Sequence, residues 1–376
     1  MSDSLSSLYG GRGIAFFGGQ GSHIFDTTGR NYIDFFNGHG ASLFGHAHPL
    51  LTEALEKGAK GVWTSGAGFE SPVREKLADE LGLILKEGRV FLCNSGTEAI
   101  EAALKLSLIL RKERSRILAC RRGFHGRTCG ALSMTFNPKY REPFMPMIGK
   151  VEHFSINDIS ENIDDNTAAV FIEPVQGEGG VFCLPPEIGV KISESCRKSS
   201  ALLVADEIQS GLGRCGAQLA SSLTGLDPDI VCLAKGLAGG LPAGAVVWKK
   251  ELGDFSPHSH GSTYGGNELV ANVSLAVLSM VMHSDLPLKA AAGGKFFRSR
   301  ISEIESGHIK DIRGMGLLNG VELDIPSLPV VKALQNNGLL SLTAGPRTLR
   351  FLPSFAADEK DFEDAALILA KTLEEF

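Results

Sequence analysis

The chain has 376 residues, 43% of them hydrophobic and 21% charged, which favours a large buried core divided between a larger and a smaller domain. The 37 Lys and Arg against 43 Asp and Glu leave a net charge of −6, which argues against nucleic acid as a partner. Without an apolar leader or a run of about 20 apolar residues, we expect a cytoplasmic protein that does not enter membranes. Seven widely spaced cysteines without a C-x-x-C pair favour reduced thiols.

The middle of the chain alternates short apolar runs with helical stretches. The runs that we expect to be strands are RVFLC, RILAC, AAVFIEP, ALLVADE, DIVCLAK and AGAVVW, at 89–93, 116–120, 168–174, 201–207, 229–235 and 243–248. Continuous apolar strands separated by helices indicate a mostly parallel sheet that is covered on both faces. We therefore predict an α/β fold, with residues 50–266 in a large, doubly wound domain.

Both chain ends are predicted to form the smaller, α+β domain, from residues 1–49 and 267–376. The N-terminal HIFDTTGRNYIDF, with Gly29 in its turn, is typical of a β-hairpin. The C-terminal part predicts helices and one strand, at 268–283, 286–305, 328–337 and 348–353, and a closing amphipathic helix from Asp358.

The segment CNSGTEA places Ser95, Gly96 and Thr97 between a predicted strand and a predicted helix. Hydroxyl groups and the first amides of a helix suit a phosphate group at such a point. The same residues also fit an ordinary helix cap. This segment alone leaves the two interpretations open.

Two further apolar strands end on charged residues. ALLVADE ends on Asp206 and Glu207, at the carboxyl end of a strand, where ligands bind in parallel sheets; Asp206 either keeps a pyridinium nitrogen protonated or caps a helix. DIVCLAK ends on Lys235, which is costly to bury unless it forms a salt bridge or serves as a neutral amine that attacks a carbonyl. Phosphate loop, acid and lysine together fit pyridoxal 5'-phosphate (PLP), which needs a Schiff-base lysine and a pyridinium partner.

The motif series resembles that of the class III, ornithine-type aminotransferases. The motifs, in the family's order from Ser95 to Pro353, are SGTEA, FHGRT, EPVQGEGG, DEIQSGLGR, AKGLAGG, HGSTYGGN, RGMGL and RFLP, and LYGGRG and YIDF…GHAHP also fit. Three segments, KYREPF, HGSTYGGN and AGPRTLRFLPSF, are most similar to acetylornithine aminotransferases and to archaeal and Thermus-type enzymes that act on ornithine or lysine attached to an amino-group carrier protein. The resemblance implies the PLP-dependent transferase fold of type I.

The implied reaction moves the ω-amino group of an α-N-acylated ornithine or lysine to 2-oxoglutarate, giving a semialdehyde and glutamate. The acyl group would be an acetyl group or the carrier protein. Within the class, the alternatives are an ornithine or 4-aminobutyrate transaminase and an aminomutase. Outside it, a PLP-binding protein without catalysis is the alternative.

The resemblance also implies the cofactor contacts. Lys235 would hold PLP as a Schiff base, and Asp206 would face the pyridine nitrogen. Gln209 would contact the ring hydroxyl, and Phe124 would stack on the ring.

The phosphate would be bound by residues of two subunits. Ser95, Gly96 and Thr97 would come from one chain and Thr263 from its neighbour. A homodimer with shared active sites follows.

Substrate contacts are implied as well. Arg127 would clamp a carboxylate with its bidentate fork, and Ser262 would touch substrate across the dimer. Arg350 would be a second, switchable arginine that pairs with Glu173 when the amine donor is bound and with the α-carboxylate when glutamate is bound.

Four histidines stand near these motifs. His39 replaces an aromatic or apolar residue of related enzymes, so it either contacts substrate or is structural. His125 is expected to pack or position rather than to act as an acid or base. His46 and His48 lack further ligands, and we predict no metal site.

The carrier-linked alternative has a consequence for the surface. An acidic carrier protein would require a basic patch at the mouth of the pocket. Arg12, Lys139 and Arg141 are its candidates.

Overall fold

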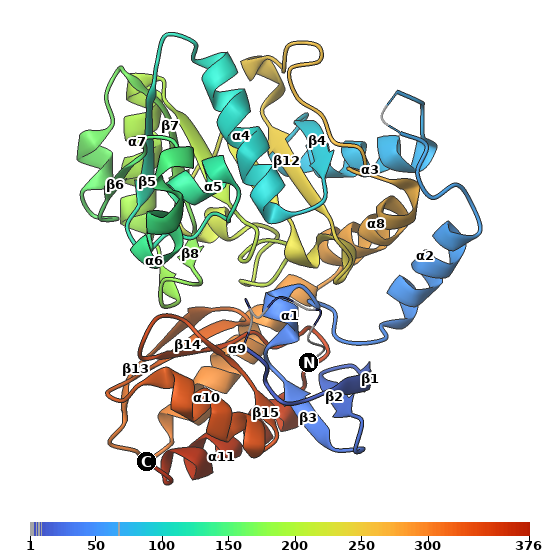
Figure 1. The fold of residues 1–376 in the computed structure, drawn as a ribbon, viewed down its shortest axis with the longest axis vertical. Coiled ribbons are helices and arrows are strands. Elements are labelled where there is room, and N and C mark those ends of the chain that lie inside the picture. Colours follow the sequence, from blue (N-terminus) through green and yellow to red (C-terminus); the bar gives the residue numbers. More distant parts are fainter. Residues whose placement is uncertain (1–3, 5, 7, 9, 67) are drawn as a thin grey trace.

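The computed structural model describes residues 4, 6, 8, 10–66 and 68–376, so Tyr9 of the LYGGRG motif lies outside the described residues. Its centre is a seven-stranded sheet with the order β4-β12-β11-β10-β7-β5-β6 (Figure 1). The strands are β4 (Arg89–Cys93), β5 (Arg116–Cys120), β6 (Glu152–Phe154), β7 (Thr167–Ile172), β10 (Leu202–Asp206), β11 (Ile230–Leu233) and β12 (Gly244–Trp248). The predicted α/β fold is confirmed.

One strand of this sheet runs against the others. Strands β6, β5, β7, β10 and β11 pair in parallel, whereas β12 is antiparallel to both β11 and β4. Residues 234–243, which join β11 to β12, form only a short 3₁₀ turn, Lys235–Ala238. A parallel return would need a crossover of about a dozen residues or more. The connection is shorter, so β12 returns antiparallel to β11, and Lys235 lies just beyond the carboxyl end of β11.

Helices cover both faces of the sheet because its strands are apolar on both sides. On one face pack α4 (Gly96–Leu110) and α5 (Cys129–Met134). The other face is covered by α2 (Pro49–Ala59), α3 (Pro72–Gly82), α7 (Pro186–Ser199) and α8 (Glu268–Met282). In β10, Val204 contacts the first group and Ala205 the second, as the two-residue period of a strand requires.

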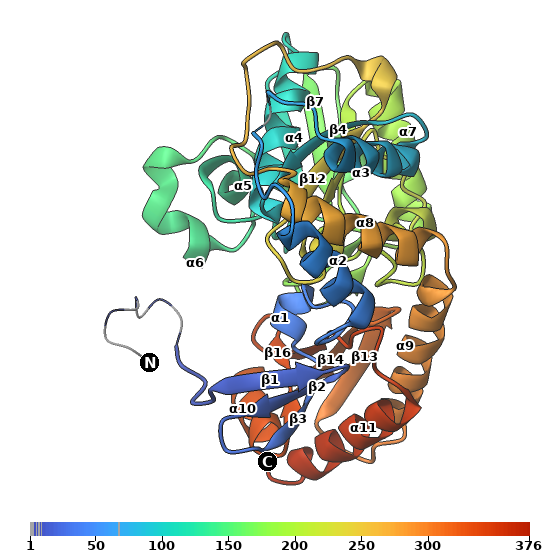
Figure 2. The same ribbon diagram turned by 90° about the vertical axis from the view of Figure 1, so that its right-hand side faces the viewer.

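Both chain ends meet in the smaller part of the molecule (Figure 2). Its two four-stranded sheets have the orders β1-β2-β3-β15 and β13-β14-β17-β16. Their strands are β1 (Phe16–Gln20), β2 (His23–Asp26), β3 (Asn31–Asp34), β13 (Ile309–Met315), β14 (Leu318–Leu323), β15 (Leu339–Leu340), β16 (Leu342–Thr343) and β17 (Thr348–Phe351). The predicted hairpin is confirmed: β2 and β3 are antiparallel, and Gly29 takes a φ of 85° in the turn.

The helices of the smaller part enclose an apolar core of their own. Helices α9 (Leu286–Ser302), α10 (Ser327–Asn336) and α11 (Glu359–Leu373) contribute to it. The remaining elements are short: α1 (Asn37–Gly40), α6 (Pro138–Arg141), β8 (Val175–Gln176) and β9 (Phe182–Cys183).

The packing of α8 bears on the division into domains. Its Ala271, Val277 and Val281 are buried in the same core as Val231 of the large sheet. We propose the predicted division, residues 50–266 against 1–49 plus 267–376, with one change: the second boundary lies between α8 and α9.

In the part of the chain that the structure describes, no single helix is long and apolar enough to cross a membrane. Helices α8 and α9 reach that length and apolar character only together, and the chain bends by 70° between them. The seven cysteines are unpaired.

Candidate active site

A cavity of about 410 Å³ opens at the carboxyl ends of the parallel strands, where α/β sheets bind ligands. Most of the residues singled out in the sequence line it. They are Ser95, Gly96, Thr97, Phe124, Arg127, Glu173, Asp206, Gln209 and Lys235. The structure therefore brings together residues that lie as much as 140 positions apart in the chain.

The turn before α4 is a helix cap that also leaves donors free. Ser95 Oγ accepts from the amide of Glu98 at 3.3 Å and donates to the Glu98 carboxylate at 3.0 Å. Thr97 Oγ1 lies 2.8 Å from the hydroxyl of Thr128 and accepts from the amide of Arg127. The hydroxyls are thus engaged, whereas the first amides of α4, at Gly96 and Thr97, have no partner within the helix. Amides at a helix N-terminus are suited to bind an anion.

Lys235 follows β11 in a left-handed backbone conformation, with a φ of 44°. Its ammonium makes no hydrogen bond or ion pair with any residue that the structure describes, and it faces the cavity. Burial lowers the pKa of Lys235, although Asp206 and Glu178 nearby oppose this effect. The structural salt bridge considered as an alternative is not formed.

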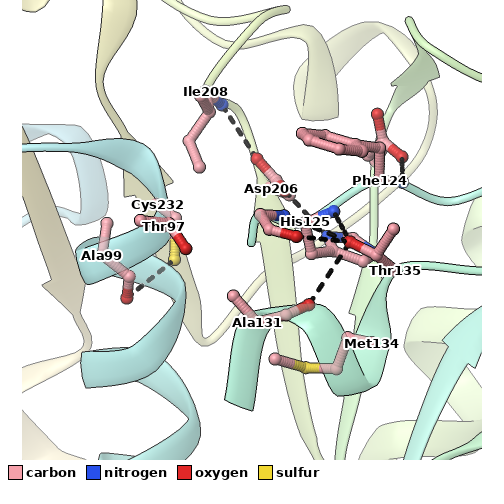
Figure 3. Close-up of polar contacts among 12 residues, drawn as sticks. Thr97, Ala99, Phe124, His125, Ala131, Met134, Thr135, Asp206, Ile208 and Cys232 are labelled. Atoms are coloured by element: carbon pink, nitrogen blue, oxygen red, sulfur yellow. Dashed lines mark hydrogen bonds and ion pairs between the residues drawn. The ribbon is translucent and has the colours of Figure 1, made fainter. Parts of the chain in front are cut away.

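Asp206 ends β10 and is 4% exposed. One carboxylate oxygen accepts from the amide of Ile208 at 3.1 Å, and the other accepts from Nδ1 of His125 at 2.8 Å (Figure 3). Burial alone would lower the pKa of His125, but the hydrogen bond to Asp206 raises it. His125 is therefore a positioning contact for Asp206, in line with the packing or positioning role expected from the sequence.

Thr135 organises the loop around His125. Its buried hydroxyl accepts from the amide of His125 at 2.9 Å and donates to the carbonyl of Gly126 at 3.0 Å (Figure 3). Sequence reasoning missed Thr135, because it stands seven residues beyond Thr128, the last residue of the FHGRT motif, in an ordinary apolar segment. Its role exists only through the folded loop.

Glu173 lies at the floor of the cavity and is 7% exposed. Its Oε1 accepts from the amide of Phe124 at 2.8 Å, and its Oε2 accepts from the amide of Gly177 at 3.3 Å. Burial raises the pKa of Glu173 to about 7, against the influence of His125. This carboxylate is occupied with backbone donors.

The predicted pairing of Glu173 with Arg350 is wrong. Arg350, on β17 and fully buried, donates from Nη2 to Oε1 of Glu178 at 2.6 Å and from Nη1 to Oε1 of Gln209 at 3.0 Å. Both glutamates stand in EPVQGEGG, and the sequence does not say which of them reaches the arginine. Both glutamates line the cavity, but the Glu178 side chain is 34% exposed, whereas Glu173 is 7% exposed and accepts from backbone amides.

Arg127 is exposed at the cavity wall. Its guanidinium lies 3.5 Å from the ring centroid of Tyr140 on α6 and 5.7 Å from that of Phe124. A second cavity, of about 600 Å³, adjoins the first; Phe124 and Glu178 line both. Tyr140 lines the second cavity, and its stacking on Arg127 was not foreseen, although it stands in the quoted KYREPF.

Ser262 and Thr263 do not line the cavity of their own chain. Ser262 Oγ accepts from Nδ2 of Asn94 at 3.0 Å and from the amide of Gly265 at 3.1 Å. Thr263 is exposed. This placement differs from that of the other predicted cofactor residues.

The other histidines have structural contacts. His46 Nε2 lies 2.8 Å from Asp34, and His48 packs its ring 5.6 Å from that of Phe44. His39 packs 4.7 Å from the ring of Phe36, and burial lowers its pKa. Among the described residues, no group of three or more His, Cys, Asp or Glu is placed to hold a metal ion.

The three basic candidates for a carrier patch have different surroundings. Arg12 is exposed, lies 5.1 Å from the ring centroid of Phe36 and donates to the carbonyl of Ser341. Lys139 is exposed and lines the second cavity, and Arg141 follows it at the end of α6. Of the three, Lys139 lines the cavity that adjoins the first one.

The cavity fits PLP by its donor set. An unpaired lysine, a buried carboxylate on the adjoining strand and open helix amides match the aldehyde, the ring nitrogen and the phosphate of this cofactor. Glycine at position 96 also suits a cofactor cavity. A Cβ there would lie 2.9 Å from the Ile208 side chain, which lines the same cavity, and would crowd it.

Comparisons with known proteins agree with this chemistry. The family model described as "Aminotransferase class-III" matches residues 14–373. The acetylornithine aminotransferase of Bacillus subtilis is 38% identical over 98% of this chain and 97% of its own length. The "[LysW]-aminoadipate semialdehyde/glutamate semialdehyde transaminase" of Sulfurisphaera tokodaii is 36% identical over 96% and 94%.

Solved structures agree as well. The ornithine aminotransferase of Toxoplasma gondii has a TM-score of 0.93 at 31% identity, covering 99% of this chain and 93% of its own. The acetylornithine aminotransferase of Elizabethkingia anophelis has a TM-score of 0.86 at 28% identity, covering 99% and 96%. The family match over nearly the whole length, and the site that fits the cofactor, lead to one conclusion: this chain is a PLP-dependent enzyme that belongs to the class III aminotransferases.

Proposed function

We propose that the enzyme moves the ω-amino group of an α-N-acylated ornithine or lysine to 2-oxoglutarate, giving a semialdehyde and glutamate, in arginine or lysine biosynthesis. The observation that carries this proposal is the buried Arg350–Glu178 pair beside the cavity. A charge pair of this kind gives one pocket two states, one neutral and one that binds a carboxylate. Two unlike substrates can then use the same site in turn.

Four residues act on the cofactor in this proposal. PLP, when bound, supplies an electron sink for the carbon that loses its proton. Lys235 would hold the aldehyde of PLP, and its amine, whose pKa is lowered by burial, would take up and return that proton as a base. Asp206, held by His125, would keep a proton on the ring nitrogen. Phe124 would cover one face of the ring.

The remaining groups orient the substrates. With the amine donor, Glu178 neutralises Arg350 and leaves the end of the pocket uncharged. With glutamate or 2-oxoglutarate, the α-carboxylate takes the place of Glu178 on Arg350. Arg127 clamps the other carboxylate, and its stacking on Tyr140 fixes the plane of the guanidinium.

We also propose a cytoplasmic homodimer in which Ser262 and Thr263 complete the site of the partner subunit. Their position outside the cavity of their own chain supports this assignment. The phosphate would then be bound by Gly96 and Thr97 of one chain and by Thr263 of the other.

The donor's acyl group is proposed to occupy the second cavity. Its volume of about 600 Å³ leaves room for more than an acetyl group, and relatives of both kinds are similar to this chain. Lys139 at its wall suits an acidic carrier protein. A free ornithine or 4-aminobutyrate donor, or an aminomutase reaction without 2-oxoglutarate, is the alternative.

A single-turnover experiment tests the function. The yellow holoenzyme is mixed with N2-acetylornithine, or with glutamate as the positive control, and the visible absorbance band is followed. Rapid loss of the band with both supports an acetylornithine donor. Loss with glutamate alone keeps the transaminase and favours a carrier-linked donor, and loss with neither contradicts the proposed function.

A further inference from the structure

One buried carboxylate joins two walls of the cavity that come from different parts of the chain. Glu173 accepts from the amide of Phe124, which follows β5, and from the amide of Gly177, which follows β8. Each oxygen serves one donor. The position of both segments therefore depends on a single side chain.

The segment at Gly177 is packed tightly against the carboxylate-binding arginine. A Cβ at Gly177 would overlap Oε1 of Gln209 and would lie 3.3 Å from Nη1 of Arg350. Gln209 Oε1 is the atom that accepts from Arg350. The next residue, Glu178, is the other partner of Arg350. A small displacement of this backbone thus moves both acceptors of the arginine.

We infer that Glu173 is a positioning residue that sets, together, the ring-stacking Phe124 and the Arg350–Glu178 pair. The inference rests on the proposed roles of Phe124 and Arg350. It replaces the direct pairing with Arg350 expected from the sequence, because Glu173 acts on the arginine through the backbone of Gly177.

A carboxylate suits this position because both its oxygens are acceptors. A glutamine offers one acceptor and would turn its NH₂ group toward the second amide, leaving a buried donor unsatisfied. The charged and titratable groups around Glu173 are His125 after β5, Asp206 at the end of β10, Lys235 after β11 and Cys120 at the end of β5. His125 and Lys235 favour its ionised form, and burial and Asp206 oppose it.

The test uses E173Q and, as a matched control, E207Q. Glu207 is also a buried carboxylate at the end of β10, but it accepts from Ser210 and Ser221 and does not line the cavity. Three quantities are measured: the Kd of the apoenzyme for PLP by fluorescence titration, the KM for 2-oxoglutarate, and the Tm of the apoenzyme.

We expect E173Q to raise both the Kd for PLP and the KM for 2-oxoglutarate about tenfold, the effect of one unsatisfied buried donor. E207Q should lower Tm and leave both constants within about twofold. If E173Q lowers Tm as E207Q does and leaves Kd and KM unchanged, Glu173 is only structural and the inference is overturned. Should E173Q not fold, E173D, which keeps the charge but is one methylene shorter, is tested for the same two increases.

The outcome is separable from that of the proposed function. The Kd of the apoenzyme for PLP does not depend on which amine is the donor. If the wild-type enzyme does not react with glutamate, the proposed function fails, while the Kd comparison between E173Q and E207Q still decides the role of Glu173.

Discussion

The half of the site that is proposed to face the cofactor and the half that is proposed to face the substrate are built differently. Asp206, Lys235 and the Gly96 turn follow three strands of one sheet, and each is placed by the strand directly before it. Arg350 comes from β17 of the smaller part and meets Glu178, 172 positions away in sequence. The cofactor half is thus fixed by local segments on a rigid sheet, and the substrate half by contacts between distant segments.

The difference predicts where the enzyme tolerates change. A sheet edge presents a fixed set of groups to an unchanging cofactor. Loops that meet across the cavity can be rearranged to accept different donors without moving the sheet. Substitutions in the cofactor half should abolish the reaction with every substrate. Substitutions in the substrate half should change the relative rates with different substrates.

The largest effect is expected for Lys235→Ala, which removes the base from the cofactor half. Proton transfer by a positioned side chain contributes about 10²–10⁴ in rate, so the variant should be nearly inactive and should lack the normal yellow band. Steady-state turnover and the visible spectrum are the measurements. Activity above a few per cent of wild type would remove Lys235 from the proposed role.

Asp206→Asn tests the same half with a smaller change. The amide keeps the shape but cannot stabilise a charged ring nitrogen, so we expect the variant to retain some PLP and to lose most of its activity, about 10²-fold or more. His125→Asn is the companion variant: it removes the group that holds Asp206 and should cause a smaller loss. Full activity in Asp206→Asn would show that another group faces the ring nitrogen.

The same division explains what the sequence revealed. The Asp206 and Lys235 positions could be predicted because an apolar strand that ends on a charged residue points to the ligand-binding edge of a parallel sheet. The partner of Arg350 could not be predicted, because EPVQGEGG contains two glutamates. Only the fold shows that Glu178 reaches the arginine while Glu173 accepts from backbone amides. Tyr140 over Arg127 and Thr135 beneath His125 are likewise contacts between segments that no local pattern records.

Glu178→Gln sharpens the comparison on the substrate side. The glutamine carries no charge, so it cannot neutralise Arg350 when the amine donor is bound. We therefore expect kcat/KM for the donor to fall about tenfold. The half-reaction with the substrate glutamate should be retained or improved. Its α-carboxylate would no longer compete with the carboxylate of Glu178 for Arg350. Separate single-turnover rates for the two amines provide the measurement. Equal losses for both amines would mean that Glu178 is not a switch.

The smallest effect concerns the stability of the apoenzyme at different pH. The pKa of Glu173 is raised to about 7 by burial, so between pH 4.5 and 7 the folded state holds more protons than the unfolded state. The contribution of Glu173 to stability is therefore greatest below its unfolded pKa and is lost as the pH rises through its folded pKa. His125, whose pKa is also raised, acts in the same direction above pH 6.5. We expect Tm of the apoenzyme to fall by a few degrees from pH 5 to 8.

Glu173→Gln separates the contribution of this carboxylate from that of its neighbours. Glutamine does not titrate, so the fall in Tm between pH 5 and 7 should become shallower, while the contribution of His125 remains. Lys235, with its lowered pKa, acts in the opposite direction and does so in both proteins, so the difference between the two Tm curves isolates Glu173. Parallel curves for the wild type and the variant would mean that this carboxylate is ionised throughout the range. The two walls of the site would then be joined by a permanent charge rather than by a group that titrates near neutral pH.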